Sequence, residues 1–387
     1  MRAFRVGLFT ECYRPIQNGI VASLAALAQA LRAHGRDYVF VTPEMPHYRD
    51  DDPRVLRVPS LPLPTRTAYR LTVPYLPRSL GNLSIVHTHS PFVTGWLGAL
   101  AARRARVPLV FTYHTQLEAY AHYVPFQSDA TRSAATQLTR AYANVADAVI
   151  VPTRAMEARL RALGVRSHVE IVPSGIDCRR FARGRRRADV RARLSVARDE
   201  RMILSVGRLG REKNVELALE AFARLDDARA RFVVVGDGTY RGALERASVR
   251  LGIRSRVTFA GEFARDDLPD VYASADAFVF TSRSETQGLV LVEALAAGLP
   301  IVAVDTPQTA DVLGGYGRLA AGDSAAVAAA LRETLTAPRN GQWPGRDVAE
   351  RYDGEKLGGR VIALYDALAG AGSARKRVAA VSSCATG

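Results

Sequence analysis

Residues 276–300 read DAFVFTSRSETQGLVLVEALAAGLP, and this stretch shows how the chain is built. Its first seven residues, 276–282, form a short apolar run that is typical of a buried strand. A loop that contains Gly288 follows, and the alanine-rich run after it predicts a helix that ends near Gly298. The order of strand, glycine turn and helix directs backbone amides of the helix N-terminus beyond the strand end, where they can bind a phosphate.

Two carboxylates, Glu285 and Glu293, stand on either side of Gly288. The pattern places Glu285 in the loop and Glu293 about two turns down the predicted helix. One carboxylate can accept hydrogen bonds from one set of hydroxyl groups and the second carboxylate from another set. A ligand with a diphosphate between two polyhydroxylated rings, which is the chemistry of a nucleotide-sugar, fits this arrangement.

The same alternation of strands and helices extends outward in both directions. In the first half the predicted strands are 4–10, 37–43, 84–90, 108–115, 146–153 and 169–175. In the second half they are 201–207, 231–238, 256–262, 276–282 and 300–305. This alternation predicts an α/β fold of two Rossmann-like, doubly wound domains with parallel sheets, facing each other across a cleft. In such sheets ligands bind beyond the carboxyl ends of the strands.

The domain boundaries follow from where the alternation breaks. We expect an N-terminal domain over 1–178 and a second domain over 201–350, with the charge-dense stretch 179–200 as the junction. A helix over 351–370 is expected to return to the first domain. The small and basic residues of 371–387 are expected to be disordered.

Length and cysteine content limit the class of protein. A chain of 387 residues favours two domains. The three cysteines, Cys12, Cys178 and Cys384, have no metal-ligand spacing, and their odd number argues against a disulfide framework. The apolar run at the N-terminus is too short for a secretory signal, and no apolar stretch approaches about 18 residues. We therefore expect a cytoplasmic protein without a spanning helix.

The formal net charge is +15, and only Lys213, Lys356 and Lys376 among the 53 basic residues are lysines. A genome biased toward arginine codons explains this on its own. Attraction to phosphates or to an anionic lipid surface is the functional alternative. Because no recognised nucleic-acid-binding module accompanies the charge, we expect no nucleic-acid partner.

The stretch SVGRLGREKNVELALEAF (205–222) resembles the other half of the signature of retaining GT-B glycosyltransferases of family 4, in which a lysine follows five residues after an arginine. The segments HTHSPF (87–92) and TYHTQLEAYAHYVPF (112–126) are most similar to bacterial members that act on diacylglycerol or related lipids. The chain departs from the common E-G-F-G pattern at 285–289, where it has ETQGL. The resemblance covers most of residues 4–310.

The resemblance implies a catalytic set of Arg208, Lys213, Glu285 and His114. Arg208 and Lys213 would bind the donor diphosphate, since a planar guanidinium and a compact ammonium together neutralise its oxygens. Glu285 would hold hydroxyls of the donor sugar, and His114 would contact that sugar near the reacting carbon. Glu293 would hold the ribose.

The family pattern also implies further contacts with the donor. Gly261 would lie near the nucleobase. The backbone amides of Gly288 and Leu289 would meet the diphosphate, helped by Gly19 on the first domain. Asn18 and Gln287 are placed among the donor-binding residues without a more specific contact. We place acceptor contacts at His89, Tyr113, Gln116 and Tyr120.

The implied reaction is transfer of a hexose from a nucleotide-sugar to an acceptor hydroxyl with retention of configuration. UDP-glucose is the first choice of donor and GDP-mannose the second. A membrane lipid such as diacylglycerol is one acceptor, and a soluble or polysaccharide-precursor acceptor is the alternative. A nucleotide-sugar or nucleic-acid binding protein without turnover is the non-enzyme alternative.

Metal ions and cofactors are not expected. The D-x-D spacing in Asp50–Asp52 lies in a proline-flanked polar loop with no strand before it. The G-D-G at 236–238 lacks the glycine that a dinucleotide fingerprint needs at 241, where the chain has Arg241. The nucleotide-sugar is thus a co-substrate and no further group is required.

A proline-rich, apolar segment over 61–78 carries Arg66, Arg70 and Arg78 and shows no clear secondary structure. Such a segment could insert an apolar tip into a bilayer while its arginines meet anionic head groups. An ordinary surface loop is the alternative. The membrane interpretation predicts a peripheral protein on the inner face of the cell membrane.

Overall fold

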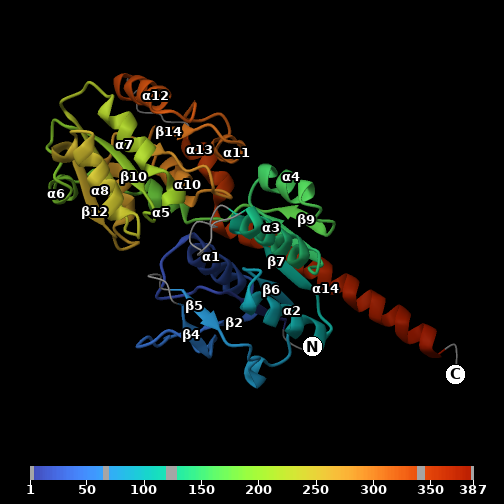
Figure 1. Ribbon diagram of the computed structural model, residues 1–387. Coiled ribbons are helices and arrows are strands. Elements are labelled where there is room, and N and C mark those ends of the chain that lie inside the picture. The colour runs from blue at the N-terminus through green and yellow to red at the C-terminus, as the bar shows by residue number, and fades with distance from the viewer. Residues whose placement is uncertain (1–3, 64–68, 119–128, 338–344, 385–387) are drawn as a thin grey trace. The chain divides into compact units, whose positions relative to one another are not determined.

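The computed structural model describes residues 4–63, 69–118, 129–337 and 345–384. The chain forms two compact units (Figure 1): unit 1 comprises Met1–Gly175 and Gly354–Gly387, and unit 2 comprises Ile176–Asp353. Each unit contains one parallel sheet with helices around it. The predicted α/β class with two parallel-sheet domains is confirmed.

The sheet of unit 1 has the strand order β3-β2-β1-β6-β7-β8-β9. Its strands are β1 (Arg5–Phe9), β2 (Asp37–Pro43), β3 (Val55–Val58), β6 (Ile85–Thr88), β7 (Leu109–Thr112), β8 (Ala148–Val151) and β9 (His168–Ile171). Its helices are α1 (Gly19–Ala33), α2 (Val93–Ala105), α3 (Asp129–Ala143), α4 (Arg154–Ala162) and α14 (Gly354–Cys384). Every residue of β6, β7 and β8 is buried, as expected for strands covered on both faces.

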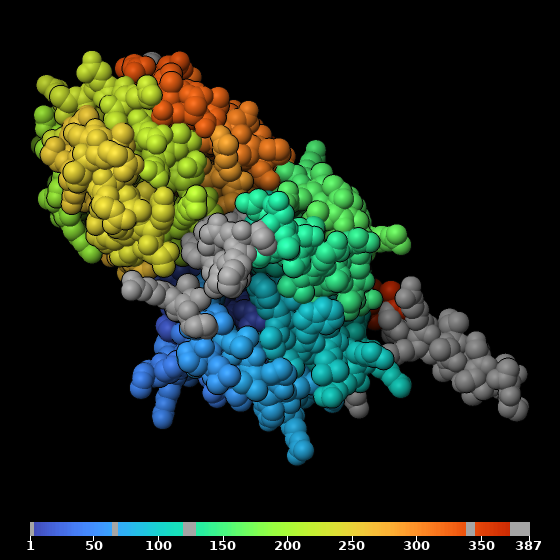
Figure 2. All heavy atoms as spheres, viewed as in Figure 1, coloured from blue at the N-terminus to red at the C-terminus, as the bar shows by residue number. Residues whose placement is uncertain are grey.

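The sheet of unit 2 has the strand order β12-β11-β10-β13-β14-β15. Its strands are β10 (Arg201–Val206), β11 (Ala230–Val235), β12 (Val257–Gly261), β13 (Ala277–Phe280), β14 (Ile301–Val304) and β15 (Arg318–Ala320). The helices are α5 (Cys178–Ala182), α6 (Ala188–Arg193), α7 (Val215–Ala223), α8 (Arg241–Arg250), α9 (Leu268–Ser274), α10 (Leu289–Ala296), α11 (Pro307–Leu313), α12 (Ser324–Thr336) and α13 (Gly345–Ala349). Figure 2 shows these segments, coloured from green to orange, gathered into one compact body.

Both sheets reverse their strand order beside their first strand. In unit 1 the reversal lies between β1 and β6, and in unit 2 it lies between β10 and β13. Loops that leave adjacent strands at such a point diverge to opposite faces of the sheet and open a crevice at its carboxyl edge. The topology therefore marks one position in each unit where a ligand-binding loop is expected.

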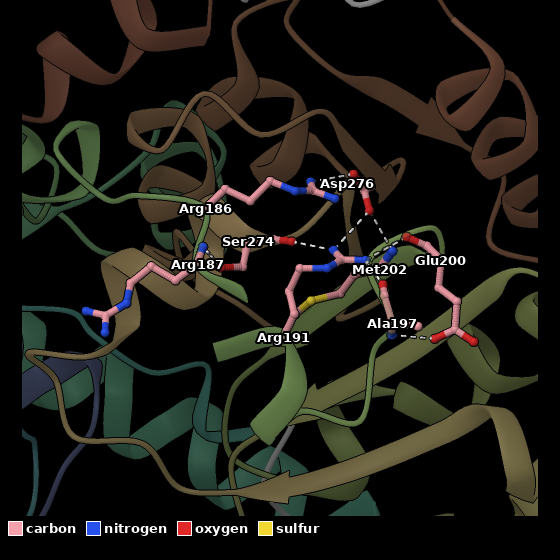
Figure 3. A network of polar contacts seen from close by, with 8 residues as sticks. All are labelled: Arg186, Arg187, Arg191, Ala197, Glu200, Met202, Ser274 and Asp276. Carbon is pink, nitrogen blue, oxygen red and sulfur yellow. Dashed lines mark hydrogen bonds and ion pairs between the residues drawn. The ribbon is translucent and has the colours of Figure 1, made fainter. Parts of the chain in front are cut away.

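The charge-dense stretch 179–200, which we expected to be a junction, differs from that expectation because α5 and α6 belong to unit 2. Figure 3 shows the reason, which is the buried guanidinium of Arg191. It donates to the carbonyl oxygens of Ser274 at 2.8 Å, Ala197 at 2.8 Å and Glu200 at 2.6 Å. Asp276 lies 3.4 Å from the same group and also accepts from Arg186 at 2.8 Å. These contacts of Arg191 and Arg186 hold residues 179–200 against the starts of β10 and β13.

The segment 61–78, for which we expected no regular secondary structure, contains short strands and a short helix. It contributes to an antiparallel hairpin of β4 (Ser60–Pro62) and β5 (Arg70–Thr72), in which Leu61 lies opposite Leu71. The short helix η1 (Arg78–Leu80) follows. Pairing across the hairpin satisfies backbone groups that the proline-rich sequence could not pair within itself. Arg66 lies outside the described residues.

The final helix, α14, packs against α1 within unit 1. Gly358 allows this approach, since a Cβ there would lie 2.2 Å from the Cβ of Ala30. Arg36 on the loop after α1 pairs with Asp366 at 2.8 Å. The helix continues to Cys384 through most of the tail that we expected to be disordered. That tail contains alanine, arginine and lysine and no proline, which is a composition that permits helix.

Candidate active site

Two loops of unit 2 leave the carboxyl ends of β10 and β13 at the reversal of strand order. Hydrogen bonds join them: the hydroxyl of Thr281 donates to the backbone carbonyl of Asn214 at 2.8 Å, and the side-chain amide of Asn214 donates to the backbone carbonyl of Thr281 at 3.3 Å. The hydroxyls of Ser282 and Ser284 both donate to the carbonyl of Glu212 at 3.3 Å. The two halves of the sequence signature, which are far apart in the chain, thus form one fixed surface.

The predicted charged residues come together on this surface. The ammonium of Lys213 contacts the carboxylate of Glu285, and their side chains are 18% and 22% exposed. The guanidinium of Arg208 donates to Glu212 at 2.5 Å. The side chain of Arg208 is 37% exposed, whereas that of Glu212 is 2% exposed. Each cation is therefore held by a carboxylate while solvent still reaches it.

The N-terminus of α10 faces the same strand end. Its N-cap is Gly288, which has φ +80°, a conformation that favours glycine. A side chain there would also be crowded, because a Cβ would lie 3.1 Å from the ring of Phe280. Since glycine offers no side-chain acceptor, the first two helix amides, those of Leu289 and Val290, are left for an anionic ligand, whereas the amide of Leu291 donates to the carbonyl of Gly288 at 2.9 Å. Gln287, just before it, is buried.

Glu293 lies one turn further along α10 and is buried. Its carboxylate accepts a hydrogen bond of 2.8 Å from the hydroxyl of Tyr272 on α9. Burial raises the pKa of Glu293, and the charges of Arg265 and Arg180 oppose that rise. The structure thus gives Glu293 a fixed protein partner, and the ribose role assigned to it stays a prediction.

The glycines after β11 have a packing function. A Cβ on Gly236 would lie 2.0 Å from the carbonyl oxygen of Gly207, and one on Gly238 would lie 2.4 Å from that of Leu209. They therefore allow the loop after β10 to cross close to the end of β11. Gly261, at the end of β12, accepts a hydrogen bond of 2.7 Å from Gly236 and has φ +72°. Gly261 thus forms a backbone turn where the two segments cross, and its position near a nucleobase stays a prediction.

In unit 1 the corresponding strand ends carry histidines. His89 follows β6 and His114 follows β7, and their ring nitrogens Nδ1 and Nε2 lie 2.9 Å apart. His87 bonds to Thr112 at 2.6 Å and to the hydroxyl of Tyr365 on α14 at 2.5 Å. The Nε2 atom of His89 is buried and has no hydrogen-bond partner within the described part of the chain.

Burial keeps these histidines uncharged. It lowers the pKa of His87 to about 3 and that of His114 to about 4, and it lowers the pKa of His89 well below its usual value. The neighbouring rings add to the effect on His87 and His89, because one imidazolium disfavours another. Near neutral pH the cluster can therefore donate and accept hydrogen bonds without carrying charge.

The loop after β1 ends at α1. The side-chain oxygen of Asn18 caps α1 by accepting from the amide of Val21 at 2.9 Å, and its amide donates to Tyr69 at 3.3 Å. Gly19 is the first residue of the helix. Asn18 is thus held in place by the fold, and a contact of Gly19 with the diphosphate stays a prediction.

Three of the four residues proposed for the acceptor are described, and all three are buried. Tyr113 is 2% exposed and Gln116 is 6% exposed, so neither offers a broad contact area in this structure. His89 belongs to the buried histidine cluster. Tyr120 lies outside the described residues.

The D-x-D sequence has a structural use. Asp50 pairs with Arg57 at 2.7 Å and Asp52 pairs with Arg54 at 2.8 Å, which fixes the turn before β3. Across the described residues, no group of three or more histidine, cysteine, aspartate or glutamate side chains could hold a metal ion. Nor does any described helix combine the length and apolar character that crossing a bilayer requires.

Comparisons with known proteins agree with this geometry. Residues 17–180 match the family described as Glycosyltransferase Family 4, and residues 186–342 match Glycosyl transferases group 1. The chain is 30% identical over 375 residues to the alpha-monoglucosyldiacylglycerol synthase of Streptococcus pneumoniae, an alignment that covers 93% of this chain and 85% of that protein. The chain belongs to the family 4 glycosyltransferases.

Other relatives of this glycosyltransferase include the GDP-mannose-dependent alpha-mannosyltransferase of Mycobacterium tuberculosis, which is 33% identical over 326 residues, 81% of this chain and 82% of that protein. Among solved structures, the sucrose-phosphate synthase of Thermosynechococcus elongatus superposes with a TM-score of 0.78 at 23% identity, over 96% of this chain and 100% of that one. That likeness establishes the GT-B fold.

Three residues of this glycosyltransferase were missed from sequence. Glu212 holds Arg208, and its signal was present, because it stands four positions after Arg208 and just before Lys213. Tyr272 holds Glu293 from another helix, and Glu11 accepts from the amide of Thr94 at 2.8 Å. Neither of these two has a local sequence signal, since each partner lies far away in the chain.

Proposed function

We propose that this glycosyltransferase moves a hexose from a nucleotide-sugar to the hydroxyl group of a membrane lipid such as diacylglycerol, with retention of the anomeric configuration. The observation that carries the donor class is the contact of Lys213 with Glu285 beside the N-terminus of α10. An ammonium and helix amides favour a diphosphate, and a carboxylate next to them favours sugar hydroxyls.

The chemistry rests on stabilising the leaving group. Arg208, Lys213 and the amides that begin at Leu289 would neutralise the charge that develops on the departing diphosphate. Both cations are already oriented by carboxylates, so little reorganisation is needed when the donor binds.

Neither motif carboxylate is placed as a nucleophile. Glu285 contacts Lys213, and Glu293 accepts from Tyr272. This favours a route on one face of the sugar. The bond from the anomeric carbon to the phosphate oxygen breaks, the acceptor oxygen bonds to the same face, and the acceptor proton passes to the departing phosphate oxygen. The configuration is retained without a covalent enzyme intermediate.

His114 is proposed to contact the donor sugar as a neutral group. Because burial lowers its pKa to about 4, it would bond a sugar hydroxyl without placing a positive charge next to the cation-like transition state. His89, bonded to it at 2.9 Å, would fix the orientation of its ring.

The choice of sugar and acceptor is supported by relatives. The names of two relatives, from Streptococcus pneumoniae and Acholeplasma laidlawii, specify glucosyldiacylglycerol synthesis, which favours a glucose donor and a diacylglycerol acceptor. UDP-glucose is the first candidate donor. Mannosyltransferase relatives named as GDP-mannose-dependent make GDP-mannose the second candidate. A soluble or polysaccharide-precursor acceptor is the alternative. The lipid acceptor implies a peripheral position on the inner face of the cell membrane.

Two measurements on the full chain test the proposal. In a thermal-shift screen, the correct nucleotide-sugar at 100 times its Kd should stabilise the protein by about 2.7 kcal/mol. In vesicles that contain diacylglycerol, the same donor should release its nucleotide and yield a glycosylated lipid. Donor binding with transfer only to a soluble acceptor would reject the lipid, and stabilisation by none of the nucleotide-sugars would reject the donor class.

A further inference from the structure

One long stretch of unit 1 carries basic side chains and no acidic ones. Residues 53–117 contain eight arginines and no lysine, aspartate or glutamate, so this stretch supplies eight of the 15 net charges. The arginines are Arg54, Arg57, Arg66, Arg70, Arg78, Arg103, Arg104 and Arg106. Arg54 and Arg57 pair with the upstream aspartates, whereas Arg103, Arg104 and Arg106 are exposed at the end of α2.

Helix α2 has an apolar face that the core does not cover. Phe92, Trp96 and Leu100 follow one another at intervals of four residues and are 45%, 44% and 38% exposed. That spacing places them along one stripe of the helix surface. A different set of α2 residues packs into the core, among them Leu97 and Ala101. A stripe of large exposed apolar side chains that ends in arginines is unusual for a surface that meets only water.

The β4–β5 hairpin of unit 1 carries a second pair of exposed apolar side chains. Leu61 and Leu71, which lie opposite each other, are 55% and 47% exposed. The half-buried carboxylate of Glu11 joins the hairpin to α2, because it accepts from the hydroxyl of Thr72 at 2.9 Å and from the backbone amide of Thr94 at 2.8 Å. The hairpin and α2 are therefore held beside each other through β5.

We propose that α2 and the β4–β5 hairpin form a docking surface for an anionic lipid bilayer. Aromatic and leucine side chains would enter the boundary of head groups and acyl chains, and Arg103, Arg104 and Arg106 would meet the lipid phosphates. Tryptophan is favoured at such a boundary because its ring is apolar while its N–H can bond to head groups.

The charge pattern selects a bilayer over a protein partner or a second copy of the chain. A second copy would bring like charge to like charge, since the surface carries arginines and its sequence no acids. Phosphate groups spread over a plane match arginines that lie at the end of a helix and near a separate hairpin. This docking proposal rests on the proposed function, since a lipid acceptor gives the enzyme a reason to bind a membrane. Docking itself can be measured without a donor and without turnover.

The first experiment measures co-sedimentation of the full chain with vesicles. We expect binding to vesicles that contain phosphatidylglycerol, weak binding to pure phosphatidylcholine, and a decrease as salt is raised. Arg103→Gln and Arg104→Gln should each weaken binding about fivefold. Arg246→Gln is the matched control, because Arg246 is exposed on α8 of unit 2. Equal binding to neutral vesicles, or equal losses in the control, would overturn the proposal.

The second experiment tests insertion directly. The chain has two tryptophans, and Trp343→Phe leaves Trp96 as the sole indole. Its fluorescence should shift to the blue on anionic vesicles and be quenched by lipids brominated along the acyl chain. Trp96→Ser should lose binding, whereas Val249→Ser, which removes a 63% exposed apolar group from α8, should not. An unshifted, unquenched Trp96 would overturn the proposal, as would a dimer in solution that Trp96→Ser dissociates.

Failure of docking and failure of the proposed function give different results. If docking is wrong and the function right, nucleotide-sugars still stabilise the protein in the thermal-shift screen while vesicles are not bound. If the function is wrong and docking right, vesicles are bound while no nucleotide-sugar stabilises the protein. Circular dichroism of each variant confirms that lost binding does not come from lost folding.

Discussion

At the reversal of strand order in unit 2, the loops carry charged side chains that solvent reaches. Near the carboxyl ends of β6 and β7 in unit 1, His87 and His89 are buried and His114 is half-buried, and the pKa of all three is lowered by desolvation. The two sheets share a topology, so the backbone alone does not explain this difference. The sheet decides where a ligand-binding loop stands, and the side chains on the loop decide what it binds. On our proposal, unit 2 binds the phosphates and unit 1 contacts neutral hydroxyl groups.

The largest effect should come from removing the phosphate chemistry of unit 2. Lys213→Ala takes away a cation that is 18% exposed and oriented by Glu285. We expect turnover with the best nucleotide-sugar to fall by about 10²- to 10³-fold, as for other losses of charge stabilisation at a leaving group. A nucleotide-release assay measures it. Lys356→Ala, at an exposed lysine on α14, is the matched control, and equal activity of the two variants would remove Lys213 from the site.

A second substitution separates stability from chemistry within unit 2. Arg191→Met removes a guanidinium that bonds three carbonyl oxygens and lies near Asp276, and it leaves those acceptors buried. We expect the free energy of unfolding to fall by about 3 kcal/mol in urea titrations. The KM for the donor should not change, because Arg191 lies among the strand starts and the donor loops lie at the strand ends. A raised KM with unchanged stability would contradict the assignment.

A smaller effect is expected at the residue that positions Arg208. Glu212→Gln keeps the shape of the side chain but removes the charge that holds the guanidinium at 2.5 Å. We expect the donor KM to rise about tenfold, equal to ~1.4 kcal/mol, with little change in kcat. Glu216→Gln, one turn further on and paired with Arg250, serves as the control. A fall in kcat alone would instead give Glu212 a role in the transition state.

Sequence predicted most of the fold because the buried strands read as continuous apolar runs. The strands expected over 276–282 and 300–305 are β13, Ala277–Phe280, and β14, Ile301–Val304. The differences arise where a tertiary contact overrides local composition. Arg191 turns a charge-dense stretch into packed helices, and the pairing of Leu61 with Leu71 gives a proline-rich segment a hairpin.

The candidate site divides in the same way. The grouping of Arg208, Lys213 and Glu285 at the strand ends was predictable, and their contact with phosphate and sugar stays a proposal. Glu212 and Tyr272 were not, since their function is to hold another side chain. The burial of His89 and Tyr113 was also not foreseen, because short alternating runs do not show which residues α14 and the neighbouring helices cover.

The smallest effect should be a pH dependence that belongs to unit 1. The pKa of His114 is about 4 in the folded protein and about 6.5 in an unfolded chain, so between those values the unfolded state binds the extra proton. Its contribution to stability is full above pH 6.5 and is lost as the pH falls toward 4. Each buried histidine adds at most about 1.4 kcal/mol per pH unit to that slope. Buried carboxylates with raised pKa, such as Glu11 and Glu293, act in the opposite direction, so the variant must be compared with the parent.

Urea unfolding of the parent and of His114→Gln between pH 5 and 6.5 isolates the contribution of His114 to the pH dependence of the free energy of unfolding. The variant should show a shallower loss of stability on acidification, whereas His168→Gln, at an exposed histidine of β9, should match the parent. Turnover of the parent should show no inflection from a histidine near pH 6.5, because the cluster stays neutral there. Identical slopes in the two variants, or a histidine inflection in turnover, would mean that solvent reaches the cluster. The contrast between a charged site in unit 2 and a neutral one in unit 1 would then be lost.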